Sequence, residues 1–370
     1  MNRICWCSVL LASLLVAQAP DDSRKRVTNS SHRPLAGAIR WDAWHGKKGA
    51  PGRAVEASLS PAKWHYRLPF FAKVISDSEV SIDGATQETM DREIAYAVGA
   101  GLDYWAFVTY EENDPMSLGL QHYLSSKRRM GLGFCQIVWY HHATFGDQLA
   151  RTVRLMQNPA YQKVLDGRPL LYVAFFSQDP QLKEWGGPAG YRKALDELRR
   201  AARDGGAGDP YIVTLDFDPV RMAEVRAQVG GDAIGTYATQ NNEIGAPYSA
   251  LAAAAQRFWT RCQATGSNVV PIVMAGWDRR PRVERPVPWE KQAPGVGLEK
   301  YYEAPTPLEL AAHLDRALRW IEANPESCPA KTALIYAWNE NDEGGWLTPT
   351  LDEGTARLDA IGRVLRPAPR

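Results

Sequence analysis

Three carboxylic side chains lie within four positions of the segment 337–346, which reads AWNENDEGGW. They are Glu340, Asp342 and Glu343, and they follow an apolar run, 332–337, that is typical of a buried strand. Two neighbouring carboxyl groups raise each other's pKa, so one can hold a proton near neutral pH, and glycosidic bond cleavage uses such a pair. The alternative is a solvated acidic turn. Because tryptophans flank the segment, we expect Glu340 and Glu343 to do acid/base chemistry, with Asp342 directed toward an arginine or solvent.

The elements that must position this pair are short apolar runs alternating with longer helical patterns. Near-continuous apolar runs indicate strands that are covered on both faces. Eight occur, at 35–41, 102–110, 134–140, 169–176, 211–217, 233–237, 269–275 and 333–338. The alternation predicts a single α/β domain, a (β/α)8 barrel of the TIM type, with long loops at 47–84 and 278–305 after the first and seventh strands. An open doubly wound sheet is the second choice, and it is weakened because no G-x-G-x-x-G follows a strand.

Several helices of this pattern are marked by their ends. Thr306, Pro307 and Glu309 form a capping box with proline in the first turn. The segments 191–203 and 248–265 carry one apolar face each, and 87–98 stops at Gly99 and Gly101.

Active sites of such barrels lie where the strands end, so the residues that follow each strand are candidates for substrate contact. They are mostly aromatic, acidic or amide side chains, as sugar binding requires. The predicted substrate-binding residues are Asp42, Trp44, His45, Tyr110, Tyr140, His141, Asp216, Tyr237, Trp277, Asp278, Arg282, Asn339 and Trp346.

Other chemistries at these strand ends have less support. His141 and His142 with Asp216 and Asp218 match no metal-ligand spacing, so we expect no metal and no cofactor. The arginines at 279, 280 and 282 either bind an anionic group of the substrate or neutralise the acidic strand end. Neither alternative is preferred by the sequence.

Four stretches resemble one known family. WNENDEGGWLTP (338–349) is similar to the end motif of the glycoside hydrolase family 99-like group, which includes proteins named WbsX. EIAYAVGAGLDYWAFVTY (93–110), NPAYQKVLDGRPLLYV (158–173) and MAGWDRRPR (274–282) agree with it and follow the family's order. The resemblance implies a (β/α)8 barrel and a retaining endo-acting α-mannosidase or mannanase that works through a 1,2-anhydro-sugar.

Carried onto this chain, the resemblance implies that Glu340 deprotonates the sugar 2-hydroxyl and that Glu343 is the general acid and then the general base. The chain departs from the family at Asn341-Asp342, where an aromatic residue often stands, and in the segment 40–45, which lacks tyrosine. These departures leave the sugar open. A glycan-binding barrel without activity and a WbsX-type glycosyltransferase remain the alternatives.

Composition and the N-terminus bear on partners and location. The formal charge is +1 and no basic run is longer than three residues, the length of Arg24-Lys25-Arg26, so nucleic acid is not an expected partner. Residues 1–19 resemble a secretory signal with an apolar stretch too short to span a bilayer, followed by a polar linker at 20–35 and the barrel domain at 36–368. We therefore expect a secreted or periplasmic protein without stable membrane insertion, acting on an oligo- or polysaccharide.

Three cysteines remain after the signal, at 135, 262 and 328. Their number and spacing favour buried free thiols over one disulfide with a free thiol.

Overall fold

The computed structural model describes residues 33–44, 49–176, 182–291, 293 and 295–367. The predicted signal, most of the linker and His45 lie outside this part. Within it, a parallel sheet holds a strand at each of the eight predicted places. These strands are β1 (Leu35–Arg40), β4 (Tyr104–Val108), β5 (Gly133–Val138), β7 (Arg168–Val173), β8 (Tyr211–Leu215), β9 (Ala233–Gly235), β10 (Asn268–Val269) with β11 (Ile272–Met274), and β12 (Thr332–Tyr336).

The sheet closes on itself through the seventh strand position. The strand order is β10-β9-β8-β7-β5-β4-β1-β12-β11, and its two ends, β10 and β11, are consecutive parts of one segment. Pro271, which has no N–H, lies between them. Its carbonyl accepts from Leu334 N at 2.9 Å, while Val270 N donates to Ile234 O at 2.9 Å, so the segment joins β9 to β12. The predicted (β/α)8 barrel is confirmed.

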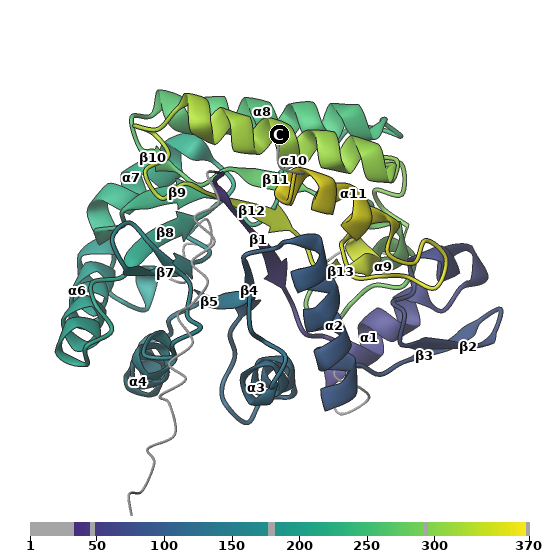
Figure 1. The fold of residues 1–370 in the computed structure, drawn as a ribbon, viewed down its shortest axis with the longest axis horizontal. Coiled ribbons are helices and arrows are strands. Elements are labelled where there is room, and N and C mark those ends of the chain that lie inside the picture. The colour runs from purple at the N-terminus through teal and green to yellow at the C-terminus, as the bar shows by residue number, and fades with distance from the viewer. Residues whose placement is uncertain (1–32, 45–48, 177–181, 292, 294, 368–370) are drawn as a thin grey trace, which may run out of the picture. The chain divides into compact units, whose positions relative to one another are not determined.

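Eight helices follow the barrel strands and cover the outside of the sheet (Figure 1). They are α2 (Gln87–Ala100), α3 (Leu118–Ser125), α4 (Phe145–Met156), α6 (Pro188–Asp204), α7 (Pro219–Val229), α8 (Tyr248–Ala264), α10 (Pro307–Ala323) and α11 (Ala356–Leu365). The capping box of Thr306 and Glu309 begins α10 as predicted. Gly99 lies inside α2, and the helix ends at Gly101, which has φ 80°. All helices in the described part are too short or too polar to cross a bilayer.

The two long loops carry short elements of their own. After β1 come α1 (Ala50–Leu59), η2 (Ala62–Arg67) and the hairpin of β2 (Ala72–Ser76) and β3 (Glu79–Ile82). This insertion has a separate apolar cluster that includes Val55, Leu59 and Trp64. After β11 comes α9 (Arg280–Glu284), which lies beside α1 in Figure 1. The remaining short elements are β6 (Lys163–Val164), η3 (Pro115–Ser117) and η4 (His142–Thr144).

The barrel interior is filled by large side chains. The Tyr104 hydroxyl lies 2.9 Å from the Tyr172 hydroxyl and 2.9 Å from Thr332 Oγ1. A Cβ at position 37 would collide with the Tyr104 ring, so glycine is needed there for close approach. Cys135, Cys262 and Cys328 are free and buried, as expected.

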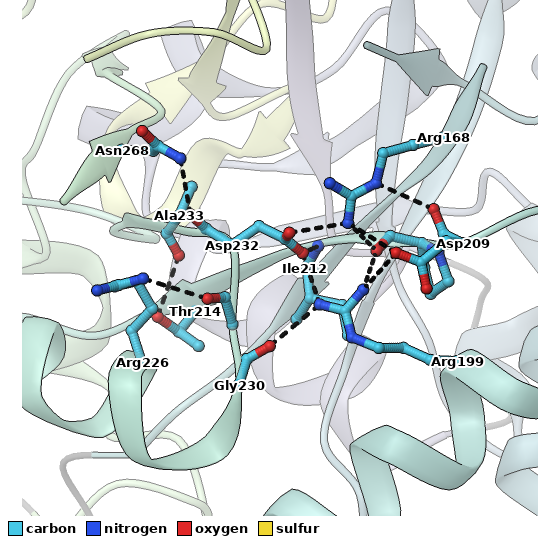
Figure 2. Close-up of polar contacts among 12 residues, drawn as sticks. Arg168, Arg199, Asp209, Ile212, Thr214, Arg226, Gly230, Asp232, Ala233 and Asn268 are labelled. Carbon is cyan, nitrogen blue, oxygen red and sulfur yellow. Dashed lines mark hydrogen bonds and ion pairs between the residues drawn. The ribbon is translucent and has the colours of Figure 1, made fainter. Parts of the chain in front are cut away.

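Arginine and aspartate side chains form an ion-pair network at the amino ends of β7, β8 and β9. Asp232 accepts from Arg168 Nη2 at 2.8 Å and from Arg199 Nη2 at 2.6 Å, and Figure 2 shows it between them. Asp209 binds the same two arginines at 3.1 and 3.0 Å, and Arg203 at 2.8 Å. The network also uses backbone groups, since Ile212 N donates to Asp232 at 2.9 Å. These residues tie three neighbouring strands together where no chemistry is predicted.

Candidate active site

The opening motif turns sharply after β12. It forms β13 (Asn339–Glu340), the single turn η5 (Asn341–Glu343) and β14 (Gly345–Trp346), with β13 and β14 paired antiparallel. Gly344 has φ 85°, and a Cβ on it would lie 2.5 Å from Asp278 N. Glycine is therefore required, because the loop after β11 approaches so closely that Asp278 N donates to Glu343 O at 2.7 Å.

Arg282 on α9 is the centre of the site. Its Nη2 donates to Glu340 Oε2 at 3.3 Å, its Nε donates to Asp342 Oδ2 at 2.5 Å, and its Nη1 donates to Glu343 Oε1. All four side chains are buried, with 5% of Arg282 exposed. One guanidinium thus holds the three carboxyl groups whose crowding marked the segment in the sequence.

A second arginine and a fourth carboxylate extend the cluster. Arg279 Nε lies 3.3 Å from Glu343 Oε1, and Arg279 also pairs with Glu290. Glu290 in turn accepts from Arg282 Nη1 at 3.1 Å. Two arginines therefore face four carboxyl groups, so the cations are outnumbered in a region with little water.

These contacts shift the pKa values of the two glutamates in opposite directions. Burial and the charge of Glu343 raise the pKa of Glu340 well above its usual range, although Arg282 opposes the shift. Burial acts on Glu343 in the same direction, but Arg282, Arg279 and a hydrogen bond from Tyr336 outweigh it and lower its pKa. Burial also raises the pKa of Asp342 against the effect of Arg282. The site thus favours a proton on Glu340 and a charge on Glu343.

Two tyrosines complete the contacts of the glutamates. The Tyr237 hydroxyl, after β9, donates to Glu340 Oε1 at 2.8 Å, and the Tyr336 hydroxyl, at the end of β12, donates to Glu343 Oε2. Burial raises the pKa of both phenols, as do the nearby carboxylates, so both stay protonated donors. Trp277 packs against Tyr336 with ring centroids 5.6 Å apart.

Three further predicted residues support the motif from the end of β1. The Asn339 side-chain oxygen accepts from Trp41 N at 2.9 Å, and its carbonyl accepts from Trp44 Nε1 at 3.0 Å. Asp42 is buried and lies 2.7 Å from Arg40 Nε. Trp44 is only 2% exposed. These side chains fix the backbone of the glutamate segment and do not offer a surface to a sugar.

Tyr110 lies between the site and the neighbouring strand ends. Its hydroxyl accepts from Trp41 Nε1 at 2.7 Å. Burial raises its pKa, and the charge of Glu340 adds to this shift although the hydrogen bond opposes it. Tyr110 is only partly buried. It is therefore the predicted residue at the end of β4 that stays within the electrostatic reach of Glu340.

The remaining predicted residues lie outside the glutamate cluster. Tyr140 is buried, and its hydroxyl donates to Thr152 Oγ1 at 3.2 Å. His141 is exposed and lies 3.4 Å from Glu184. Asp216 is buried and accepts from the backbone N of Phe217 at 2.7 Å. No cluster that could hold a metal ion occurs in the described ranges.

Asp278 and Trp346 are held by contacts with arginine side chains of the protein. Asp278 accepts from Arg280 at 2.8 and 2.7 Å and also pairs with Arg67. Trp346 is 1% exposed and carries the Arg357 guanidinium 3.7 Å from its ring centroid. A ring that is covered in this way offers no face to a sugar, so Trp346, predicted to bind substrate, has a packing role in this structure.

Sequence reasoning missed several members of the site. Tyr336 was treated as part of an apolar strand, although an aromatic hydroxyl four residues before Glu340 on the same chain was the available signal. Glu290 and Arg67 come from the long insertions, where no pattern distinguished them. For the arginines at 279, 280 and 282, the structure favours the neutralising alternative, because each pairs with a carboxylate of the protein.

Comparison with known proteins gives the fold. No protein-family model matches the sequence, and no curated protein matches it. Among solved structures, the family 99 endo-α-mannosidase from Bacteroides thetaiotaomicron aligns over 90% of this chain and 98% of its own, with 13% identity and a TM-score of 0.54. The chain has the fold of that enzyme. The same enzyme in complex with Bis-Tris propane gives a TM-score of 0.53 at 14% identity, covering 90% and 99% of the two chains.

Proposed function

We propose that this protein is a glycoside hydrolase that cleaves an oligo- or polysaccharide, with Glu340 and Glu343 as the acid/base pair. The observation that carries the proposal is that Arg282 brings Glu340 and Glu343 together at the carboxyl end of the barrel, where their contacts favour a proton on Glu340 and a charge on Glu343. One group that keeps its proton beside one that stays charged is the arrangement that glycosidic cleavage uses. The shared fold with an endo-α-mannosidase supports an α-mannoside-like substrate. The resemblance of the segment 338–349 to the family 99-like motif implies a retaining outcome.

The test is cleavage of a broad glycan panel by the purified chain and by two variants. Glu340→Gln and Glu343→Gln keep the size of each side chain and remove its acid/base function. We expect the wild type to release new reducing ends and each variant to lose about 10²- to 10⁴-fold in rate. Cleavage at wild-type rates by both variants would contradict the proposal.

The roles within the pair follow from the resemblance. Glu340 takes the proton of the sugar 2-hydroxyl, whose oxygen attacks C1, and Glu343 gives a proton to the leaving oxygen. Water then opens the anhydro-sugar with Glu343 as base. The contacts in this structure favour the opposite proton positions, so the proposed roles need one proton to move from Glu340 to Glu343 before the reaction. Withdrawal of Arg282 from Glu343 on substrate binding would promote this transfer, because Arg282 holds Glu343 as the anion.

An activated substrate separates these roles. An aryl glycoside with a strongly acidic phenol as leaving group needs no proton donor. On the roles above, such a substrate restores the first step, the release of the phenol, in Glu343→Gln but not the water step that uses Glu343 as base, and it leaves Glu340→Gln inactive in both. Restoration of Glu340→Gln alone would show that Glu340 is the general acid, and it would rule out the proton transfer.

A second candidate function is glycan binding without cleavage. It is favoured by the engagement of Glu343, whose Oε1 meets two arginines and whose Oε2 accepts from Tyr336. The side chains of Glu340 and Glu343 are 4% and 11% exposed. This function predicts retention on an immobilised glycan with no new reducing ends, and equal retention of Glu340→Gln.

We also propose export, on the evidence of the signal-like residues 1–19. Fractionation of the producing cells tests it. The protein should be found in the medium or periplasm with its N-terminus shortened by about 19 residues. A full-length chain in the cytosolic fraction would contradict export.

A further inference from the structure

A cavity opens between the ends of β4 and β5 and helix α4, away from the two glutamates, with a volume of about 390 Å³. This is within the range of small-molecule sites, roughly 300–1,000 Å³. Its walls include the aromatic residues Tyr110, Trp139 and Tyr140. Because Tyr110 also bonds to Trp41, the cavity adjoins the residues that brace the glutamate segment.

Arg151 on α4 gives this cavity an unsatisfied cation. Its Nη2 makes one long hydrogen bond, 3.3 Å to Ser117 Oγ. Its Nη1 is buried and has no partner among the residues that the structure describes, and no carboxylate of those residues forms an ion pair with it. Burial lowers the pKa of Arg151, with the charge of Glu112 opposing the shift. A partly buried guanidinium with one buried N–H group unsatisfied and no ion-pair partner in the described part of the chain is unfavourable, and a bound anion would relieve that cost.

Gln136 on β5 adds an unsatisfied acceptor in the same cavity. Its Nε2 donates to Thr152 O at 3.4 Å and to the Tyr161 hydroxyl at 3.3 Å. Its Oε1 is buried without a hydrogen-bond partner in the described ranges. Arg151 therefore lacks an anionic acceptor and Gln136 lacks a neutral donor. A single ligand that carries a carboxylate and hydroxyl groups offers both partners.

Acidic side chains on the cavity wall limit the charge of that ligand. Glu112 is engaged by Arg154 at 2.8 Å, and Glu111 and Asp147 are exposed lining residues. They repel a dianion more strongly than a monoanion. A carboxylate fits this balance better than a phosphate group, which carries about −1.5 to −2 charges at neutral pH.

We propose that this cavity binds a hexuronate residue of a glycan, with Arg151 holding the carboxylate and Gln136 Oε1 accepting from a sugar hydroxyl. The identification of the ligand as part of a glycan rests on the proposed function. The site itself does not depend on cleavage, because neither of the two glutamates lines the cavity.

Calorimetric titration of the full chain with free glucuronate, glucose and sulfate tests the proposal, in a background of Glu340→Gln with Glu343→Gln. We expect glucuronate to bind, glucose and sulfate to bind at least about tenfold more weakly, and Arg151→Gln to weaken glucuronate binding by about tenfold or more. Arg200→Gln is the control, an exposed arginine on α6 that does not line the cavity, and it should change the Kd by less than about twofold.

Three outcomes would overturn the proposal: unchanged glucuronate binding in Arg151→Gln, equal losses in Arg151→Gln and Arg200→Gln, or sulfate binding as tight as glucuronate binding. Gln136→Met, which removes the acceptor without charge, should weaken glucuronate binding by several-fold, and it decides the question where Arg151→Gln does not fold. Glucuronate binding by a chain that cleaves nothing would contradict the proposed hydrolase and leave this site standing. Cleavage of a glycan by a chain that does not bind glucuronate would support the proposed hydrolase and contradict this site.

Discussion

The two ends of the barrel both place arginines among acidic side chains, but in opposite proportions. At the amino end, Arg168 and Arg199 share Asp209 and Asp232 (Figure 2). Arg203 also pairs with Asp209, so cations are in excess. Several of these side chains are partly exposed, and backbone carbonyls accept their remaining N–H groups. Each aspartate there has its charge matched, which suits a network that holds three strands together.

At the carboxyl end the balance is reversed. Arg282 and Arg279 face Glu340, Asp342, Glu343 and Glu290, and the central groups are almost fully buried. Because the cations cannot neutralise every carboxyl group, the pKa values of Glu340 and Glu343 move apart. A network in which every carboxylate is paired with an arginine stabilises the fold. A buried cluster with more carboxyl groups than arginines instead gives its members different pKa values, which acid/base chemistry can use.

The largest expected effect is on the free energy of unfolding when the central cation is removed. Arg282→Met leaves three buried carboxyl groups around an apolar side chain, and we expect a loss of about 3–5 kcal/mol at pH 7. The loss should shrink at pH 5, where the carboxyl groups take up protons. Arg199→Met is the matched change at the amino end, where two arginines remain, and should cost about 1 kcal/mol. Urea unfolding of both variants measures this, and equal losses would contradict the contrast between the two ends.

A smaller effect of opposite sign is expected for Glu340. Its pKa is raised in the folded protein, so as pH rises the unfolded chain releases this proton first, and the free energy of unfolding falls. Glutamine cannot ionise. Glu340→Gln should therefore gain stability relative to the wild type at pH 8, on the order of 1 kcal/mol, and the gain should disappear below about pH 4.

Glu343 is the control, because its effect on the free energy of unfolding should have the opposite pH dependence. Its folded pKa is lowered, so it contributes stability above the ordinary glutamate pKa and loses it as pH falls through the folded value. Glu343→Gln should accordingly be less stable than the wild type at pH 8. Thermal unfolding of the three proteins across pH 4–8 tests both signs, and a gain in both variants or in neither would argue against separated proton affinities.

The smallest effect is expected at the exposed edge of the amino-end network. Arg203 binds one oxygen of Asp209 and is half-exposed. Arg203→Gln should change the free energy of unfolding by less than about 1 kcal/mol and leave glycan cleavage at the wild-type rate. A reduced rate of cleavage would show that the two ends are coupled.

The barrel could be predicted from the sequence because the patterns that mark its strands and helices are local. Near-continuous apolar runs marked each of the eight barrel strand positions, and the capping box at Thr306 marked the start of α10. Glu340 and Glu343 were found by the rule that chemistry lies where strands end. The structure brings both of them to Arg282 and adds Tyr237 from the predicted set.

The rest of the site depends on contacts between distant segments. Glu290 reaches the cluster from an insertion without a periodic pattern, and Tyr336 was concealed within an apolar strand. A tryptophan beside a glutamate can face the substrate or pack behind the loop, and only the fold shows that Trp346 is covered by Arg357. Arg151 gave no signal, since an unpaired cation is defined by what surrounds it.

The most direct test of the separated pair is a carboxyl ¹³C NMR titration of protein labelled at glutamate side chains, with the resonances assigned from Glu340→Gln and Glu343→Gln. We predict one glutamate that titrates well above the usual range and is missing from Glu340→Gln, and one that titrates below it and is missing from Glu343→Gln. Two resonances that both titrate near the ordinary glutamate pKa of about 4.3 would contradict the account.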